Sequence, residues 1–179
     1  NINLMDILHA KSLGYKIKLL AISEIKNKKL MERVHPCLVL SDSYIAKING
    51  VLNAIIVDGD PIGRSVLQGE GAGPGATSSA LISDLCSILR GNIKYPFGVS
   101  HFLRKKIAKF NILNHICSSY LRIEVKDQPG VLSSITKIFA KNKISIKNLI
   151  QSPDKKNKTA SIAIITHKNM EKNFYNLLL

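Results

Sequence analysis

A glycine-rich turn at residues 69–77 is the feature that most constrains how this chain can fold. Four of the chain's eleven glycines lie in this stretch, which reads Gly-Glu-Gly-Ala-Gly-Pro-Gly-Ala-Thr. A helical pattern follows it, with Leu81, Leu85, Ile88 and Leu89 on one side. A turn that opens a helix leaves backbone N–H groups unpaired, and these favour an anion or a close-packed cofactor.

Gly71, Gly73 and Ala76 match the spacing of a dinucleotide-binding fingerprint, but their surroundings do not fit the first turn of a Rossmann fold. That turn needs a second parallel strand, with an acidic residue at its end about 20 residues further on. Here the helix runs into Gly91, and a Pro-containing connector follows. Two interpretations stay open from the chemistry alone: one part of a cofactor site, or a helix cap with close backbone packing.

The hydrophobic pattern before the connector predicts an α+β region with an antiparallel-rich sheet. Its strands are predicted at residues 16–23, 31–40, 51–57 and 64–68, and its helices at residues 3–13 and 76–90. The first strand is mostly apolar in its second half, which favours a buried strand. We therefore place one domain at residues 1–91 and a connector with some helix at residues 92–118.

Residues 119–179 predict a second α+β domain with the order β-α-β-β-α. Strands are expected at residues 120–125, 144–151 and 159–166, and helices at residues 131–141 and from residue 169 onward. A ferredoxin-like βαββαβ unit has one more strand, so we expect a truncated unit. The helix at 131–141 is amphipathic, and its residues Val131, Leu132, Ile135, Ile138 and Phe139 are predicted to face inward.

Composition narrows the classes of partner. The net charge of +14 suggests nucleic acid, but the lysines are scattered and no aromatic residues interleave with them, so a solvated surface is favoured. No apolar run reaches the length of a membrane span. Cys37, Cys86 and Cys117 are far apart and odd in number, which indicates reduced, buried thiols in a cytoplasmic protein. His9 and His167 are expected at the surface.

The turn Asp127-x-Pro129-Gly130 joins the first strand of the second domain to its helix. The helix begins at Val131 and aims its N-terminus at the turn, where an amino-acid carboxylate would fit. Asn148, on the strand expected beside it, would offer an amide to the same ligand. An ordinary strand–helix turn is the alternative reading.

Several motifs together resemble a known family. They are Gly14-Tyr15-x-Ile17-Lys18-Leu19-Leu20-Ala21, Arg33-Val34-His35-Pro36, Asn53-Ala54 and Gly69-x-Gly71-Ala72-Gly73-x-x-x-Thr77. In this order they resemble the C-terminal part of the catalytic region of homoserine dehydrogenase. The stretch Leu121-Arg122-x-x-Val125-x-Asp127-x-Pro129-Gly130-Val131-Leu132 resembles the ACT domain that follows this region in many bacterial members.

The resemblance implies an enzyme that interconverts L-homoserine and aspartate 4-semialdehyde with NAD or NADP, on the route to threonine and methionine. It implies cofactor contacts at Gly71, Ala72 and Gly73, with Glu70 as their neighbour, and a helix from Thr77 that packs on the nucleotide-binding domain. It also implies a homo-oligomer whose paired ACT domains bind threonine at their seam, near Asp127, Gly130, Val131 and Asn148.

The resemblance names no catalytic residue in this chain. The Rossmann domain, the substrate-binding carboxylates and the lysine that handles the hydroxyl proton are expected before Asn1, so we expect a fragment that is inactive by itself. A regulatory ACT protein that binds an amino acid without catalysis is the alternative function.

Overall fold

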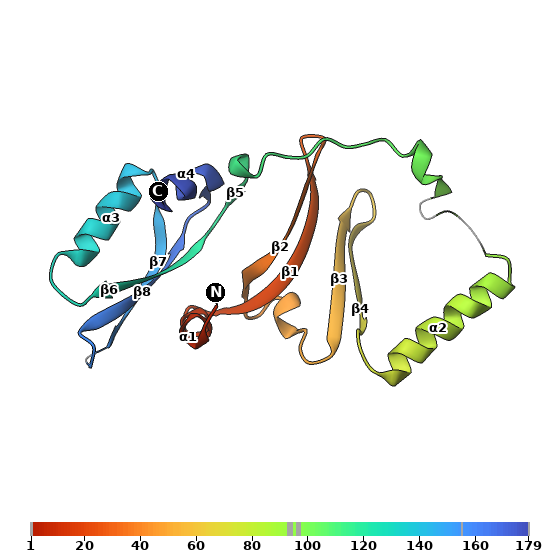
Figure 1. Ribbon diagram of the computed structural model, residues 1–179, viewed down its shortest axis with the longest axis horizontal. Coiled ribbons are helices and arrows are strands. Elements are labelled where there is room, and N and C mark those ends of the chain that lie inside the picture. Colours follow the sequence, from red (N-terminus) through yellow and green to blue (C-terminus); the bar gives the residue numbers. More distant parts are fainter. Residues whose placement is uncertain (1, 93–94, 96–97, 155, 179) are drawn as a thin grey trace. The chain divides into compact units, whose positions relative to one another are not determined.

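The computed structural model describes residues 2–92, 95, 98–154 and 156–178, so positions 93, 94, 96 and 97 of the predicted connector lie outside the described residues. The chain forms two compact units, one of residues 1–41 and 108–179 and the other of residues 42–107. Within the described residues, antiparallel strands and four α-helices confirm the predicted α+β class (Figure 1).

The first unit begins with helix α1 (Leu4–Ser12) and a long hairpin of β1 (Tyr15–Lys26) and β2 (Lys29–Leu40). Asn3 and Asp6 form a reciprocal capping box at the start of α1. The hairpin turn is only Asn27 and Lys28, with φ of 50° and 61°, as a type I′ turn requires. The prediction of a buried first strand is wrong: β1 alternates between half-buried and exposed residues because it pairs with β2 alone.

The C-terminal part of the first unit is a three-stranded antiparallel sheet in the order β6-β8-β7. Its strands are β6 (Tyr120–Lys126), β7 (Ile146–Asp154) and β8 (Thr159–Thr166), and its helices are α3 (Val131–Lys141) and α4 (Glu171–Leu178). The chain order agrees with the predicted β-α-β-β-α pattern. The short strands β5 (Ile116–Cys117) and β9 (Asn169–Met170), which pair with each other, were not predicted.

The hydrophobic core lies between this sheet and its two helices. Phe139, Ile144, Ile162, Ile164 and Phe174 form the buried cluster. Within α3 the inward prediction is wrong for two residues: Leu132 is 38% exposed and Ile138 is 50% exposed, because the buried side of the helix is centred on Phe139.

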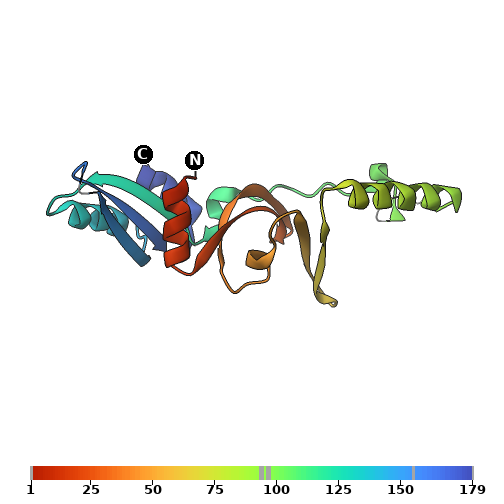
Figure 2. The same cartoon turned by 90° about the horizontal axis from the view of Figure 1, so that it is seen from below.

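The opposite face of β8 is also buried, at Ser161, Ala163 and Ile165. Helix α1 lies against this face, as Figure 2 shows, and its own buried residues are Asp6, His9 and Ala10. The prediction that His9 lies at the surface is therefore wrong. The helical pattern alone does not reveal that α1 docks on a sheet more than a hundred residues further along the chain.

The second unit contains the hairpin of β3 (Leu52–Gly59) and β4 (Gly63–Glu70), followed by helix α2 (Pro74–Leu89). Short 3-10 turns occur at Ile45–Lys47 in this unit, at His101–Leu103 in the connector, and at Ile112–Asn114 in the first unit. No residue of α2 is buried. Its apolar face is therefore exposed, with Leu85 at 52% and Leu89 at 77%.

Phe139 provides a test of the core. Replacing Phe139, which is 2% exposed, by Ala should cost about 3–5 kcal/mol of unfolding free energy through lost transfer energy and a cavity. The neighbouring Ile138→Ala is the matched control and should cost less than about 1 kcal/mol, because Ile138 is half exposed. Urea unfolding measures the loss of unfolding free energy in each variant, and amide hydrogen exchange in β8 gives a second measurement. Equal losses would contradict this assignment of the core.

Candidate functional site

The glycine turn begins where β4 ends, at the exposed Glu70. The Gly71 N–H donates to the carbonyl oxygen of Val51 at 2.9 Å, which fixes the turn against the start of β3. A Cβ atom on Gly71 would lie 1.5 Å from Nδ2 of Asn53, so a larger residue here would require the exposed Asn53 side chain to move. Glycine at position 71 thus lets the Asn53 side chain pack directly on the turn.

Gly73 is required for its backbone conformation. It has φ 120° and ψ 156°, a region that L side chains rarely adopt, and it is the N-cap of α2. Pro74 at the first helical position has no N–H, and no side chain caps this helix end. The backbone N–H groups of Gly75 and Ala76 therefore face outward, beside the exposed Ala72. The turn presents bare backbone that fits a polar or anionic group.

The second predicted site, the turn between β6 and α3, has a defined geometry. Gly130 has φ 90° and is the N-cap of α3, and its carbonyl oxygen accepts from the Ser134 N–H at 3.0 Å. The Asp127 N–H donates to the Lys158 carbonyl oxygen at 2.9 Å. Val131 is the first residue of the helix. No side chain caps α3, so this N-terminus also offers backbone donors.

Asn148 does not lie beside this turn, because β8 separates β7 from β6. The expectation that the two strands are neighbours is wrong, since the β-α-β crossover leaves room for an antiparallel strand between them. Asn148 pairs with Ile165, and so faces α1 and not α3. Gln151 reaches the turn instead: its Nε2 donates to Asp127 Oδ1 at 3.3 Å. No signal in the sequence pointed to Gln151, because strand order decides this contact.

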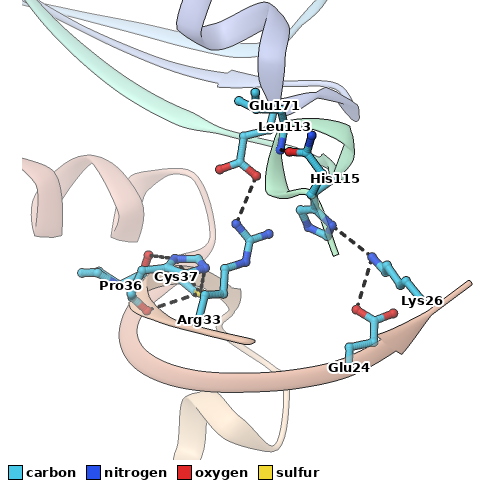
Figure 3. A network of polar contacts seen from close by, with 10 residues as sticks. Glu24, Lys26, Arg33, Pro36, Cys37, Leu113, His115 and Glu171 are labelled. Atoms are coloured by element: carbon cyan, nitrogen blue, oxygen red, sulfur yellow. Dashed lines mark hydrogen bonds and ion pairs between the residues drawn. The ribbon is translucent and has the colours of Figure 1, made fainter. Parts of the chain in front are cut away.

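A group of charged residues, which we call the polar joint, connects the β1–β2 hairpin to the C-terminal part of the first unit. It consists of Glu24, Lys26, Arg33, His115 and Glu171 (Figure 3). Arg33 Nη1 lies 3.3 Å from Glu171 Oε2, and the two side chains are only 18% and 21% exposed. Lys26 Nζ lies 3.1 Å from His115 Nδ1 and 3.2 Å from Glu24 Oε2.

His115 is the buried centre of the polar joint. Burial lowers the pKa of its imidazole, and the nearby charges of Arg33 and Lys26 lower it further. A neutral ring can accept the Lys26 hydrogen bond at Nδ1 and carry its own proton on Nε2. The geometry therefore favours the uncharged form of His115.

A second polar contact, the α1 latch, holds α1 on the C-terminal sheet. The buried Asp6 carboxylate accepts hydrogen bonds from Tyr120 Oη at 2.9 Å and from Arg122 Nε at 2.8 Å. Burial alone would raise the pKa of Asp6, but hydrogen bonds from the Asn3 backbone, Arg122 and Tyr120 outweigh it, so the pKa is lowered. His9 Nε2 lies 3.0 Å from Ser152 Oγ. The latch therefore keeps a charged carboxylate at a buried position.

A cleft of 1250 Å³ lies between the hairpin and the C-terminal sheet of the first unit. Its walls include Arg33 and Cys37 on one side and Tyr120 and Glu171 on the other. Burial raises the pKa of the Cys37 thiol, although Arg33 partly opposes this. All three cysteines are free, as predicted, but half-buried and not fully buried.

Comparisons with known proteins decide which family these features belong to. Residues 1–86 match the family model described as homoserine dehydrogenase, and residues 119–178 match that of the ACT domain. The homoserine dehydrogenase of Neisseria gonorrhoeae is 38% identical over 173 residues, which span 93% of this chain and 40% of that protein. The homoserine dehydrogenase of Helicobacter pylori is 35% identical, over 97% of this chain and 41% of that protein.

The chain belongs to the homoserine dehydrogenase family and carries an ACT domain. A solved homoserine dehydrogenase from Thiobacillus denitrificans superposes with a TM-score of 0.80 at 32% identity, over 97% of this chain and 40% of that one. The chain thus spans about 40% of the length of the curated relatives it matches. No helix in the described residues is long and apolar enough to span a membrane.

The polar joint connects the two family regions. Arg33 lies in the residues matched by the homoserine dehydrogenase model, and Glu171 lies in the ACT domain. His115 belongs to the intervening connector, which neither model matches. The motif Arg33-Val34-His35-Pro36 thus contributes a contact to the ACT domain, a role that the sequence motif did not suggest.

His115 makes stability depend on pH in a defined direction. The folded-state pKa of His115 lies below the ordinary value of 6.5, so between the two pKa values the unfolded chain binds more protons than the folded chain. The contribution of His115 to the free energy of unfolding is therefore lost as the pH falls through 6.5 and below. The urea midpoint should therefore fall between pH 7.5 and 5.5, and fall less in His115→Gln. His167→Gln, at an exposed histidine, should keep the wild-type slope. An unchanged slope in His115→Gln would refute the prediction.

Proposed function

We propose that this chain is the C-terminal part of an NAD(P)-dependent homoserine dehydrogenase, with residues 1–91 in the catalytic region, residues 92–118 as connector and residues 119–179 as ACT domain. The substrates would be L-homoserine and aspartate 4-semialdehyde, in threonine and methionine biosynthesis. The observation that carries the proposal is the presence of both family regions in order, with 97% of the chain superposing on one solved homoserine dehydrogenase.

The glycine turn supports a cofactor role for Glu70, Gly71, Ala72 and Gly73. Its backbone is open, since an added Cβ on Gly73 would meet no heavy atom within 4 Å. NAD or NADP, when bound, would supply the hydride chemistry. This chain's contribution would be to position the cofactor: the Val51 carbonyl oxygen holds the Gly71 N–H, and α2 would direct its N-terminal N–H groups at the ligand.

The exposed apolar face of α2 fits the same proposal. Five large apolar residues of this helix are between 52% and 77% exposed. A surface of this kind on a helix usually marks a contact with another domain or chain. We infer that α2 packs on the nucleotide-binding domain of the intact enzyme, which would carry the glycine turn to the cofactor.

The ACT domain supports regulation by an amino acid, with threonine as the proposed effector. Asp127, Gly130 and Val131 form a turn whose backbone donors and carboxylate suit a zwitterionic ligand. Asn148 would take part only from a second copy, because within one chain it faces the opposite side of the sheet. We therefore propose a cytoplasmic homo-oligomer in which ACT domains pair.

A regulatory ACT protein without catalysis is the second candidate. The observation that favours it is that the core of the ACT domain is the best-buried part of the chain. The two candidates differ in one respect: only an enzyme part should restore dehydrogenase activity when joined to a nucleotide-binding domain.

A chimera tests the catalytic proposal. Residues 1–179 should replace the matching C-terminal part of the Neisseria gonorrhoeae homoserine dehydrogenase and retain homoserine-dependent reduction of NAD or NADP, followed at 340 nm by the reduced nicotinamide. Gly73→Ala in this chimera should lower kcat/KM by about tenfold, because alanine strains the turn. Gly69→Ala is the control, since Gly69 has ordinary φ and open space. The 179-residue chain alone should show no activity, and activity there would contradict the proposal.

Threonine binding tests the regulatory proposal. L-Threonine should give a heat of binding in calorimetry and raise the melting temperature of the chain, because a ligand that binds only the folded state stabilises it. D-Threonine should do neither. Asp127→Asn should remove the heat, whereas Asp58→Asn, which is in the second unit, should keep it. Heat with no activity in the chimera would favour the non-catalytic alternative.

A further inference from the structure

The connector in the first unit is hydrogen-bonded to both parts that it separates in sequence. On one side it adds to the β1–β2 hairpin: the Leu30 N–H donates to the Ala108 carbonyl oxygen at 2.9 Å, and the Phe110 N–H donates to the Leu30 carbonyl oxygen at 2.8 Å. On the other side its strand β5 pairs with β9, immediately before α4. The connector is therefore a structural link and not a free tether.

His115 is the point where these two attachments meet. Its side chain contacts Lys26 of β1, while its carbonyl oxygen accepts from the backbone N–H of Glu171 at 2.8 Å. The Glu171 side chain in turn reaches Arg33 of β2. A closed set of contacts thus joins β1, the connector, α4 and β2 (Figure 3).

The Arg33–Glu171 pair is well shielded from water, so breaking it costs more than breaking a surface ion pair. It is also incompletely satisfied. Nε of Arg33 is buried and has no hydrogen-bond partner among the described residues. An unpaired buried donor raises the free energy of this arrangement. A second arrangement in which Arg33 Nε gains a partner would relieve that cost.

The cleft leaves space for such a rearrangement. The 1250 Å³ between the hairpin and the ACT sheet is lined by Arg33, Tyr120 and Glu171. Among the described residues, polar side-chain contacts bridge it at three places: the polar joint, the α1 latch, and the contact of Lys147 Nζ with Tyr15 Oη at 3.3 Å. A shift of α4 against the hairpin would therefore change few contacts, and the Arg33–Glu171 pair is among them.

We propose that the Arg33–Glu171 ion pair, held in place by His115, transmits the ligand state of the ACT domain to the β1–β2 hairpin of the homoserine dehydrogenase region. This inference rests on the proposed function, because it requires an amino acid that binds the ACT domain. Ligand binding at the N-terminus of α3 would shift α4 through the buried cluster that Phe139 of α3 and Phe174 of α4 share. That shift would change the Arg33–Glu171 pair and alter the stability of β2. Arg33 and Glu171 act as positioning residues and touch no reacting group.

Hydrogen–deuterium exchange of the 179-residue chain, with and without L-threonine, tests this coupling. In the wild type, threonine should slow exchange at residues 126–135 of the ACT domain and change exchange at residues 29–36 of β2 by about fivefold or more, the low end of typical coupling. In Glu171→Gln the protection at 126–135 should remain and the change in β2 should be lost. Arg33→Gln, which removes the other partner of the ion pair, should likewise keep the protection at residues 126–135 and lose the change in β2.

Asp58→Asn is the matched control, because it removes one negative charge from an ion pair in the second unit and should keep the β2 response. Normal melting of Glu171→Gln or Arg33→Gln shows that the variant is folded. If residues 126–135 are protected but β2 does not respond in the wild type, or still responds in both variants, the inference is overturned. If threonine protects neither region, the proposed effector fails, and the inference fails with it.

Discussion

Burial of strand β8 on both faces is the constraint on which the first unit depends. Every residue from Ala160 to Thr166 is buried, so both faces of the strand need a cover. Helices α3 and α4 cover one face with Phe139 and Phe174, and α1 covers the other. Because α1 continues through Gly14 into β1, covering β8 also attaches the N-terminal hairpin to the ACT domain.

Outside the hydrophobic core, this attachment is made by polar contacts, the α1 latch and the polar joint. The α1 latch satisfies a buried carboxylate with three donors, and a fully satisfied group of this kind holds one geometry. The Arg33–Glu171 pair differs, because Arg33 Nε has no partner. The two charged groups, Asp6 of the latch and Arg33 of the polar joint, therefore differ in how many of their hydrogen-bonding atoms are paired, although His9 Nδ1 in the latch is also buried without a partner among the described residues. This difference between the two charged groups is the physical reason for placing a movable contact at the Arg33–Glu171 pair.

The second unit differs from the first because its glycine turn and its helix α2 are left exposed. The glycine turn needs glycine at position 73 for its backbone conformation, and glycine at position 71 lets the Asn53 side chain pack on the turn. Helix α2 buries none of its residues. Open backbone beside an unburied apolar helix face supports a role for this unit as one wall of a site, with the packing partner supplied by another domain.

The sequence by itself determined the elements whose signals are local. The hydrophobic pattern of residues 3–13 marked α1, and the glycine turn marked the start of α2. The periodicity of residues 131–141 and 159–166 marked α3 and β8, because turns and hydrophobic spacing act over a few residues. The resemblance to the homoserine dehydrogenase family followed from motifs of the same short range. Only the tertiary structure decided that β8 separates Asn148 from Asp127, that His9 is buried, and that Arg33 meets Glu171. Those facts depend on strand order and on contacts between residues more than a hundred positions apart, which no local pattern encodes.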